Sequence, residues 1–205
     1  MFSDLYQTIS QSATVEFKDK GSRFIAFAQA VESDADVKQF LNSIKDQHPK
    51  ATHHCYAYRL GLDKMMNYRA NDDGEPSGTA GKPILGQIDS KQLTNVMVVV
   101  VRYFGGIKLG VSGLIHAYKT ATKMVLEQAP IVQKQVLDYG EIQTDYAQIN
   151  DLMRLLKKEQ VDILEQQYFD TYQTITIRAG RIKSHALADE LSQWKNLNYR
   201  LLYSR

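Results

Sequence analysis

The chain has 205 residues, of which 43% are apolar and 23% charged, and its 25 basic and 23 acidic residues give a net charge of +2. This composition is typical of a globular protein with one or two domains, and it excludes collagen-like and disordered chains. The single cysteine, Cys55, cannot form an internal disulfide and excludes a multi-cysteine zinc site, so we expect a reducing, cytoplasmic location.

Hydropathy argues against a membrane protein. The first residues of the chain have neither the basic nor the apolar region of a signal peptide. The longest apolar run, residues 96–101, is far shorter than the ~20 residues that cross a bilayer. We therefore expect no membrane association.

Hydrophobic periodicity divides the chain into two domains, residues 1–132 and 133–205. In the first, residues 14–31 predict a hairpin around a Lys20-Gly21 turn, followed by a helix that Ser33 or Asp34 caps and that ends before Pro49. Residues 52–60 predict a strand. The continuous apolar run at 96–101 predicts a central strand covered on both faces.

Residues 111–127 predict a helix with one apolar face and one solvent face. The face expected in the core consists of Val111, Leu114, Ile115, Tyr118, Ala121, Thr122 and Val125. The face expected in solvent consists of Ser112, His116, Lys119 and Lys123.

The second domain predicts strands at about 136–144, 161–169, 172–179 and 198–203, with helices at 146–158 and 183–194. This βαββαβ order is that of the ferredoxin-like split βαβ unit. Its open sheet face is one that RNA-recognition modules use, but the aromatic-rich RNA-binding string is absent. A packing or docking domain is the preferred interpretation, and as a scaffold it would bind a protein partner by itself.

Charge is balanced in each half of the chain. Residues 1–133 contain 15 basic and 13 acidic residues, and residues 134–205 contain 10 of each. Binding to RNA would therefore use a local patch, such as Arg102, Lys108, Lys119 and Lys123. No sequence-specific DNA binding is expected.

Seven of the 12 glycines lie between Gly74 and Gly110. The string RYFGGIKLG, at the end of the central strand and before a helix, suits an anion site in which Arg102 and Lys108 lie near the helix N-terminus. It is neither a Walker loop nor a dinucleotide fingerprint. The alternative is that Gly105, Gly106 and Gly110 only allow a sharp turn between strand and helix.

The string NDDGEPSGTAGKP holds three carboxylates, Asp72, Asp73 and Glu75, beside Ser77 and Thr79. Oxygen ligands of this kind can hold Mg²⁺ or Ca²⁺, although the EF-hand spacing is missing. The alternatives are a simple turn at Asp-Gly and a short helix near Ala80 with Thr79 as its N-cap.

The consecutive residues His53, His54 and Cys55 alternate between the two faces of a strand. Adjacent strand residues cannot supply the base that a cysteine nucleophile needs, so we interpret Cys55 as a small buried residue. His54 is the histidine that could line the glycine-rich loops. Known hydrolase and zinc motifs are absent from the sequence.

The string DGEPSGTAGKPIL, then VVVVRYFGGIKLG and a helix ending in AYKTA, closely resembles the Impact family, and the two-domain layout resembles its bacterial members of the YigZ type. The resemblance implies an α+β fold: an N-terminal β-α domain similar to the second domain of small-subunit ribosomal protein five, and a ferredoxin-like C-terminal domain similar to domains III and V of elongation factor G. It also implies a link to translation, because eukaryotic relatives are associated with translational control.

The sequence departs from the family pattern where the usual run is close to GTGGLVRAY. Ser112 replaces a glycine, and His116 replaces an arginine. A permanent positive charge beside the expected anion site is thereby exchanged for a side chain that titrates near neutrality.

Our leading hypothesis is a non-enzymatic regulator linked to translation, without a cofactor or metal, that binds RNA, the ribosome or a translation-related protein. The alternative is an enzyme acting on a phosphorylated or nucleotide substrate with a carboxylate-bound metal. No catalytic residue is assigned. The expected binding residues are His54, Asp73, Glu75, Ser77, Thr79, Arg102, Tyr103, Gly105, Gly106, Lys108, Gly110 and His116.

Overall fold

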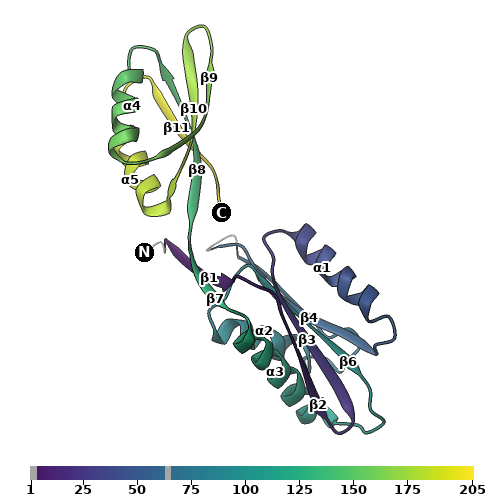
Figure 1. The fold of residues 1–205 in the computed structure, drawn as a ribbon. Coiled ribbons are helices and arrows are strands. Elements are labelled where there is room, and N and C mark those ends of the chain that lie inside the picture. The colour runs from purple at the N-terminus through teal and green to yellow at the C-terminus, as the bar shows by residue number, and fades with distance from the viewer. Residues whose placement is uncertain (1–3, 63–65) are drawn as a thin grey trace. The chain divides into compact units, whose positions relative to one another are not determined.

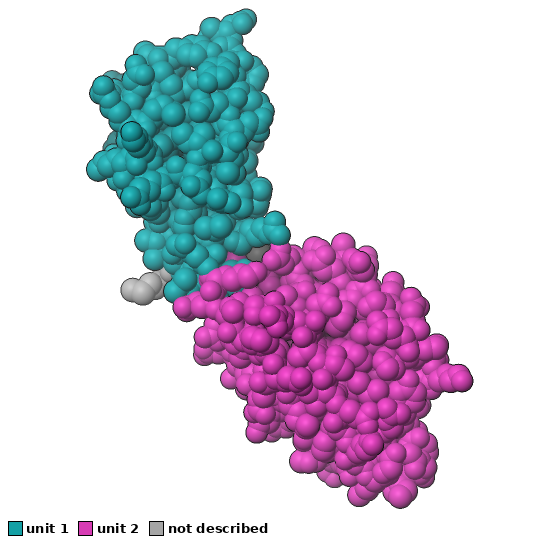
Figure 2. Space-filling model, viewed as in Figure 1, with its two compact units in different colours: residues 1–6, 135–205 teal, residues 7–134 magenta. Residues whose placement is uncertain are grey.

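The computed structural model describes residues 4–62 and 66–205. The chain forms two compact units, one of Gln7–Lys134 and one of Gln135–Arg205 with Met1–Tyr6 (Figure 2). We call them the N-terminal unit and the C-terminal unit. Both contain helices and sheets, which confirms the α+β class.

The N-terminal unit is built on a five-stranded antiparallel sheet in the order β2-β3-β6-β4-β5 (Figure 1). Its elements are β2 (Ala13–Asp19), β3 (Ser22–Ala30), α1 (Asp34–Gln47), β4 (His53–Leu60), β5 (Asn67–Asn71), α2 (Gly81–Ser90), β6 (Val96–Tyr103) and α3 (Gly110–Gln128). Outside this sheet, β1 (Leu5–Ile9) and β7 (Ile131–Gln135) pair as a two-stranded sheet.

The predicted central strand is confirmed, because β6 lies in the middle of the sheet and residues 96–101 are fully buried. One face of the sheet packs on α1 and the other on α2 and α3, as Figure 1 shows. A strand covered on both faces gains from apolar side chains at every position, which explains why its sequence does not alternate.

Local signals determine several of these elements. Lys20 and Gly21 adopt positive φ values and connect β2 to β3, as predicted for the hairpin. The Ser33 side chain accepts a hydrogen bond from the Asp36 amide and thereby caps α1. By contrast, β5 was not predicted, because its side chains are mostly exposed and give no apolar alternation.

The predicted core face of α3 is wrong at two positions. Val111 and Ile115 are 59% and 38% exposed, whereas Leu114, Tyr118 and Leu126 are buried. The apolar stripe of the sequence extends over the whole helix, but in the first two turns none of the described residues covers the side on which Val111 and Ile115 lie.

The C-terminal unit has the predicted βαββαβ order of elements. They are β8 (Leu137–Asp145), α4 (Ile149–Lys158), β9 (Asp162–Tyr168), β10 (Tyr172–Gly180), α5 (Arg181–Leu191) and β11 (Leu197–Ser204). The strands form an antiparallel sheet in the order β11-β8-β10-β9. Its core lies between one face of this sheet and the two helices, and it includes Ile142, Leu156, Ile175 and Leu187.

The other face of this sheet is open and close to electrically neutral. Arg200 pairs with Glu141 and Arg178 pairs with Asp162, so both of these arginines face a carboxylate. None of the described helices is long and apolar enough to span a membrane.

Candidate functional site

Strands β3, β4 and β6 surround Arg102, the residue that the sequence places at the centre of the site. In the antiparallel registers, both His53 of β4 and Phe24 of β3 lie opposite Arg102. Strand side chains alternate between the faces, so Arg102 shares the face of Val98 and Val100, which α2 and α3 cover. Arg102 is only 6% exposed and lies in the interior.

A buried carboxylate neutralises this arginine. The Oε1 atom of Glu75 accepts hydrogen bonds from Arg102 Nη1 at 2.8 Å and from the Tyr118 hydroxyl at 2.7 Å. The side chains of Glu75 and Arg102 are 3% and 7% exposed. The rings of Phe24 and Phe104 lie within 5.6 Å of the guanidinium carbon and screen it from water. The charge of Arg102 is therefore neutralised inside the unit, while its Nε atom is buried without a hydrogen-bond partner among the described residues.

Tyr118 and Cys55 continue this cluster into the core. Burial raises the pKa of Tyr118, and the neighbouring Cys55 and Glu75 add to the effect, so the hydroxyl stays protonated and donates to Glu75. Burial also raises the pKa of the Cys55 thiol, which donates to the Asp72 carbonyl oxygen at 2.9 Å. Cys55 is fully buried, and a neutral thiol is a poor nucleophile.

His53 is the histidine that lies beside this cluster. Its Nδ1 is 2.7 Å from the carbonyl oxygen of Asp73, and because a carbonyl only accepts, Nδ1 carries a hydrogen. Its Nε2 is 3.8 Å from Glu75 Oε1. His53 therefore connects the β5–α2 loop to the buried ion pair.

His54 and Tyr103 lie on the opposite face of the sheet, away from Glu75 and Arg102. His54 Nε2 is 3.1 Å from the carbonyl oxygen of His48, and the Tyr103 hydroxyl is 2.9 Å from His48 Nδ1. The expected binding residues are thus divided between the two faces, because strand alternation places neighbours in sequence on opposite sides.

Asp72 organises the β5–α2 loop. Its Oδ1 accepts from the amides of Ala80 and Gly81, and its Oδ2 accepts from the amide of Gly78, all within 3.0 Å. Burial raises the pKa of Asp72, but these three hydrogen bonds outweigh that effect and lower the pKa below its usual value. The start of α2 is therefore capped by a carboxylate from the preceding loop, in the favourable field of the helix dipole.

Thr79 does not cap α2, contrary to the alternative weighed for it. The N-cap residue of α2 is Ala80, which makes no capping hydrogen bond through its side chain. The Thr79 hydroxyl instead donates to the Pro76 carbonyl oxygen at 2.7 Å. Thr79 is 1% exposed, so it stabilises the loop from inside. Ser77, two residues earlier, is exposed.

The three carboxylates of the loop have separate partners. Asp72 accepts from the loop amides, Asp73 Oδ2 accepts from the His54 amide at 2.6 Å, and Glu75 is bonded to Arg102. Among residues 4–62 and 66–205, no group of three or more His, Cys, Asp or Glu side chains is placed to hold a metal ion.

Gly105 is required by a close approach of two turns. A Cβ atom at this position would lie 1.9 Å from the carbonyl carbon of Gly21 in the β2–β3 turn. The Ser22 hydroxyl oxygen accepts from the Gly105 amide at 3.3 Å and from Arg102 Nη2 at 3.4 Å. Gly105 therefore anchors the β6–α3 loop against the hairpin beside the buried arginine.

The remaining expected residues lie on an exposed surface. Gly106 in the β6–α3 loop and Gly110 at the first position of α3 adopt φ values of 86° and 74°. Lys108 and His116 are exposed. Large apolar side chains lie in the same segment, with Phe104, Ile107 and Val111 each about half exposed or more. We call residues 104–116 the β6–α3 surface.

Three residues of the cluster were missed from the sequence: His53, Tyr118 and Ser22. Tyr118 was expected in the core, and His53 was placed on the same strand face as Cys55, but neither was connected to Glu75. The register between β4 and β6 places His53 opposite Arg102, whereas Ser22 and Tyr118 reach the cluster from β3 and α3. Periodicity within one element contains none of these pairings.

The N-terminal unit is an α+β domain with a central buried strand, glycine-rich loops and a buried arginine–glutamate pair. Comparison with known proteins gives its family. The Impact N-terminal domain matches residues 20–126, about half of the chain. The chain belongs to the Impact family. The Impact family member YigZ of Escherichia coli is 36% identical over 76% of this chain and 76% of its own.

Solved structures extend the comparison. A crystal structure described only as that of a hypothetical protein covers 98% of both chains, with 28% identity and a TM-score of 0.72. The protein described as the two-domain translational regulator Yih1 is 31% identical over 60% of this chain and 47% of its own, with a TM-score of 0.38, which is too low to compare the two folds.

Proposed function

We propose that this protein is a non-enzymatic, cytoplasmic regulator linked to translation, which acts by binding RNA, the ribosome or a translation-related protein through the β6–α3 surface and the adjoining β5–α2 loop. Membership of the Impact family supports the link to translation, because the resemblance to this family implies eukaryotic relatives that are associated with translational control. The ferredoxin-like nature of the C-terminal unit and its likeness to elongation factor G domains are part of the same proposal.

The observation that carries the proposal is the exposure of large apolar side chains on an anchored surface. Ile107 and Val111 are 57% and 59% exposed, and Phe104 is 49% exposed. Exposed large apolar side chains commonly contact a partner, and these three lie within eight residues of the chain. The loop that presents them is fixed at its base by Gly105, which packs on the β2–β3 turn.

This chemistry favours a protein partner over a phosphate backbone. The guanidinium of Arg102 is buried and bonded to Glu75, so it does not face a partner. The cations that remain exposed in the segment are Lys108 and, when protonated, His116. Phosphate contacts need several cations, whereas apolar side chains lose water most favourably against another apolar surface.

The enzyme alternative finds less support in the geometry. A metal-dependent phosphate chemistry needs carboxylates that converge on one point. Here Asp72, Asp73 and Glu75 are bonded to three different sets of donors, and the Cys55 thiol is buried and neutral.

Binding of the full chain to purified ribosomes, ribosomal RNA and a cell extract, measured at several salt concentrations, tests the proposal. We expect Ile107→Ser and Val111→Ser each to weaken the binding roughly tenfold, because each removes an apolar contact worth about 1.4 kcal/mol. Met124→Ser is the matched control, since Met124 is 37% exposed on another face of α3.

The salt dependence separates the partners. Binding to RNA would fall steeply with salt, and Lys108→Ala would reduce the log–log slope by about 0.7–0.9. Binding to a protein would change little with salt and would depend on Ile107 and Val111. The proposal fails if the chain binds none of these partners, or if the Met124 control weakens binding as much as the Val111 variant.

A further inference from the structure

The C-terminal unit has a groove at the free edge of its sheet. Strand β9 is the last strand in the order β11-β8-β10-β9. The backbone N–H and C=O groups on its outer side therefore pair with no other strand among the described residues. A cavity of about 800 Å³ lies along this edge, lined by residues of α4 and by residues 161–164. Exposed edges of this kind can accept an added strand.

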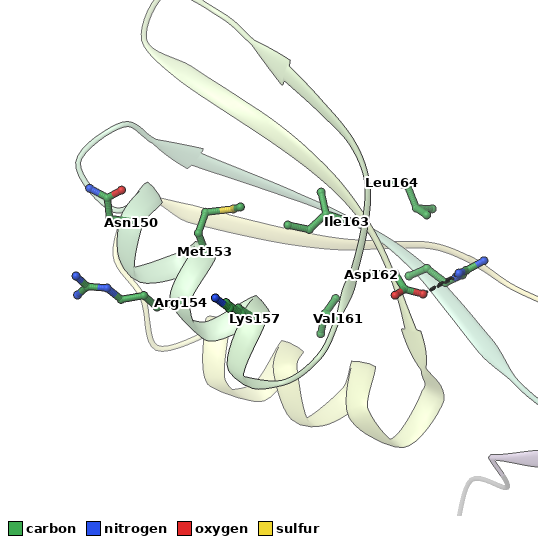
Figure 3. Close-up of a pocket in the computed structure, with 9 residues that line it drawn as sticks. Asn150, Met153, Arg154, Lys157, Val161, Asp162, Ile163 and Leu164 are labelled. Atoms are coloured by element: carbon green, nitrogen blue, oxygen red, sulfur yellow. Dashed lines mark hydrogen bonds and ion pairs between the residues drawn. The ribbon is translucent and has the colours of Figure 1, made fainter.

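The floor of the groove is apolar on both sides of the edge strand. Figure 3 shows Met153 of α4 and Ile163 of β9 in the space between helix and strand, and Leu164 on the other side of the strand. Leu164 is 47% exposed. It is the extra residue of a bulge, because Ile163 pairs with Ile177 and Glu165 pairs with Thr176. The bulge turns an apolar side chain outward where a partner would lie.

The rim of the groove is positively charged. Arg154 and Lys157 lie on α4, and the side chain of Arg154 is 83% exposed. The only carboxylate among the residues that line this cavity is Asp162, whose Oδ2 already accepts from Arg178 at 2.7 Å. Asp151, outside the lining, is 3.5 Å from Arg154 in a fully solvated geometry and screens it weakly.

We propose that this groove binds an extended segment of a partner protein that has apolar and acidic side chains on the same face, and that the segment pairs with the outer edge of β9 as a fifth strand. Backbone hydrogen bonds to the strand edge would hold it in place. Every second side chain of the segment would face α4, where apolar ones would pack against Met153 and Ile163 and carboxylates would meet Arg154 and Lys157. This site lies in the unit that the proposed function does not use.

Charge argues against a second copy of this chain as the occupant. Edge-to-edge pairing of two copies is isologous, so each copy would bring its own Arg154 and Lys157 to the same interface. Like charges placed together destabilise such a contact. A nucleic acid is also disfavoured, because the floor is apolar and Arg178 is already paired with Asp162.

The test uses random peptides displayed on phage and selected against the full chain, followed by binding of the enriched peptides measured by fluorescence anisotropy. We expect the enriched sequences to carry apolar and acidic residues at every second position, on the face toward α4. Arg154→Glu with Lys157→Glu should weaken their binding roughly tenfold or more, because attraction becomes repulsion. Lys195→Glu is the matched control: it is an exposed lysine of the same unit that does not line the groove.

A change in the peptide backbone tests strand addition without altering the protein. Methylation of the amides on one edge of the peptide should abolish binding, whereas methylation on the other edge should leave it intact, because a strand pairs through one edge only. The proposal is overturned if selection enriches no peptides, if the charge-reversed variant binds them as well as the wild type, or if both methylation patterns act alike. A dimer in ultracentrifugation that Leu164→Lys dissociates would replace the peptide by a second copy.

Discussion

The buried ion pair offers the sharpest test of the N-terminal unit. Glu75→Gln removes the negative charge that neutralises Arg102, while the glutamine oxygen remains available to the Tyr118 hydroxyl. The guanidinium then stays buried without a counter-charge, at 7% exposure of its side chain. Breaking a buried pair in this way costs about 3–5 kcal/mol. Against a total stability of about 5–15 kcal/mol, the free energy of unfolding falls by about a fifth or more.

The assay is urea unfolding followed by two signals. With a urea slope of about 2 kcal/mol per molar, the part of the far-ultraviolet circular dichroism transition that belongs to the N-terminal unit should shift down by roughly 2 M. The single tryptophan, Trp194, packs against the core of the C-terminal unit. Its fluorescence therefore reports that other core, and we expect its midpoint to stay unchanged.

An exposed ion pair with a similar distance between its charged atoms gives the control. Glu16 and Arg23 are 2.7 Å apart, and their side chains are 35% and 49% exposed. Solvent screens such a pair, so Glu16→Gln should leave the midpoint within experimental error. The double variant Glu75→Gln with Arg102→Met should recover part of the loss, because no unpaired charge remains buried. If Glu75→Gln is no more destabilising than Glu16→Gln, the ion pair does not stabilise the unit and our reasoning is refuted.

Three further outcomes follow from the loops and the core. Gly105→Ala should lower the free energy of unfolding by about 1–3 kcal/mol, because its Cβ would overlap the Gly21 backbone. Gly86→Ala should raise it by about 0.5–1 kcal/mol, because Gly86 lies in the middle of α2 with open space around it. Thermal unfolding of both variants measures these changes. Because the pKa of Asp72 is lowered in the folded protein, its contribution to stability is present above pH 3.8 and is lost as the pH falls through the lower folded value. Asp72→Asn should therefore reduce the loss of unfolding free energy between pH 5 and pH 2. An unchanged loss would contradict the capping role. The Cys55 thiol, whose pKa is raised by burial, should react with a thiol reagent only in urea, and fast labelling of the native protein would show that the core opens.

Local patterns in the sequence were sufficient for most elements. The hairpin turn at Lys20-Gly21 and the central strand at 96–101 follow from turn chemistry and from unbroken apolar character. The βαββαβ order of the C-terminal unit follows from alternating periods of hydrophobicity. By contrast, β5 has few buried side chains, so no period distinguishes it from a loop.

What the sequence by itself determined is the order of the elements and the set of polar residues near the glycines. Only the tertiary structure decided which of them meet. The pairing of Glu75 with Arg102 depends on how the loop after β5 closes over β6, and the separation of His53 from His54 depends on the face that each takes in the sheet. Val111 is exposed because the described residues that pack on α3 do not cover the side of its first turn on which Val111 lies. Contacts between segments far apart in the chain are set by register and closure, which periodicity within one segment does not contain.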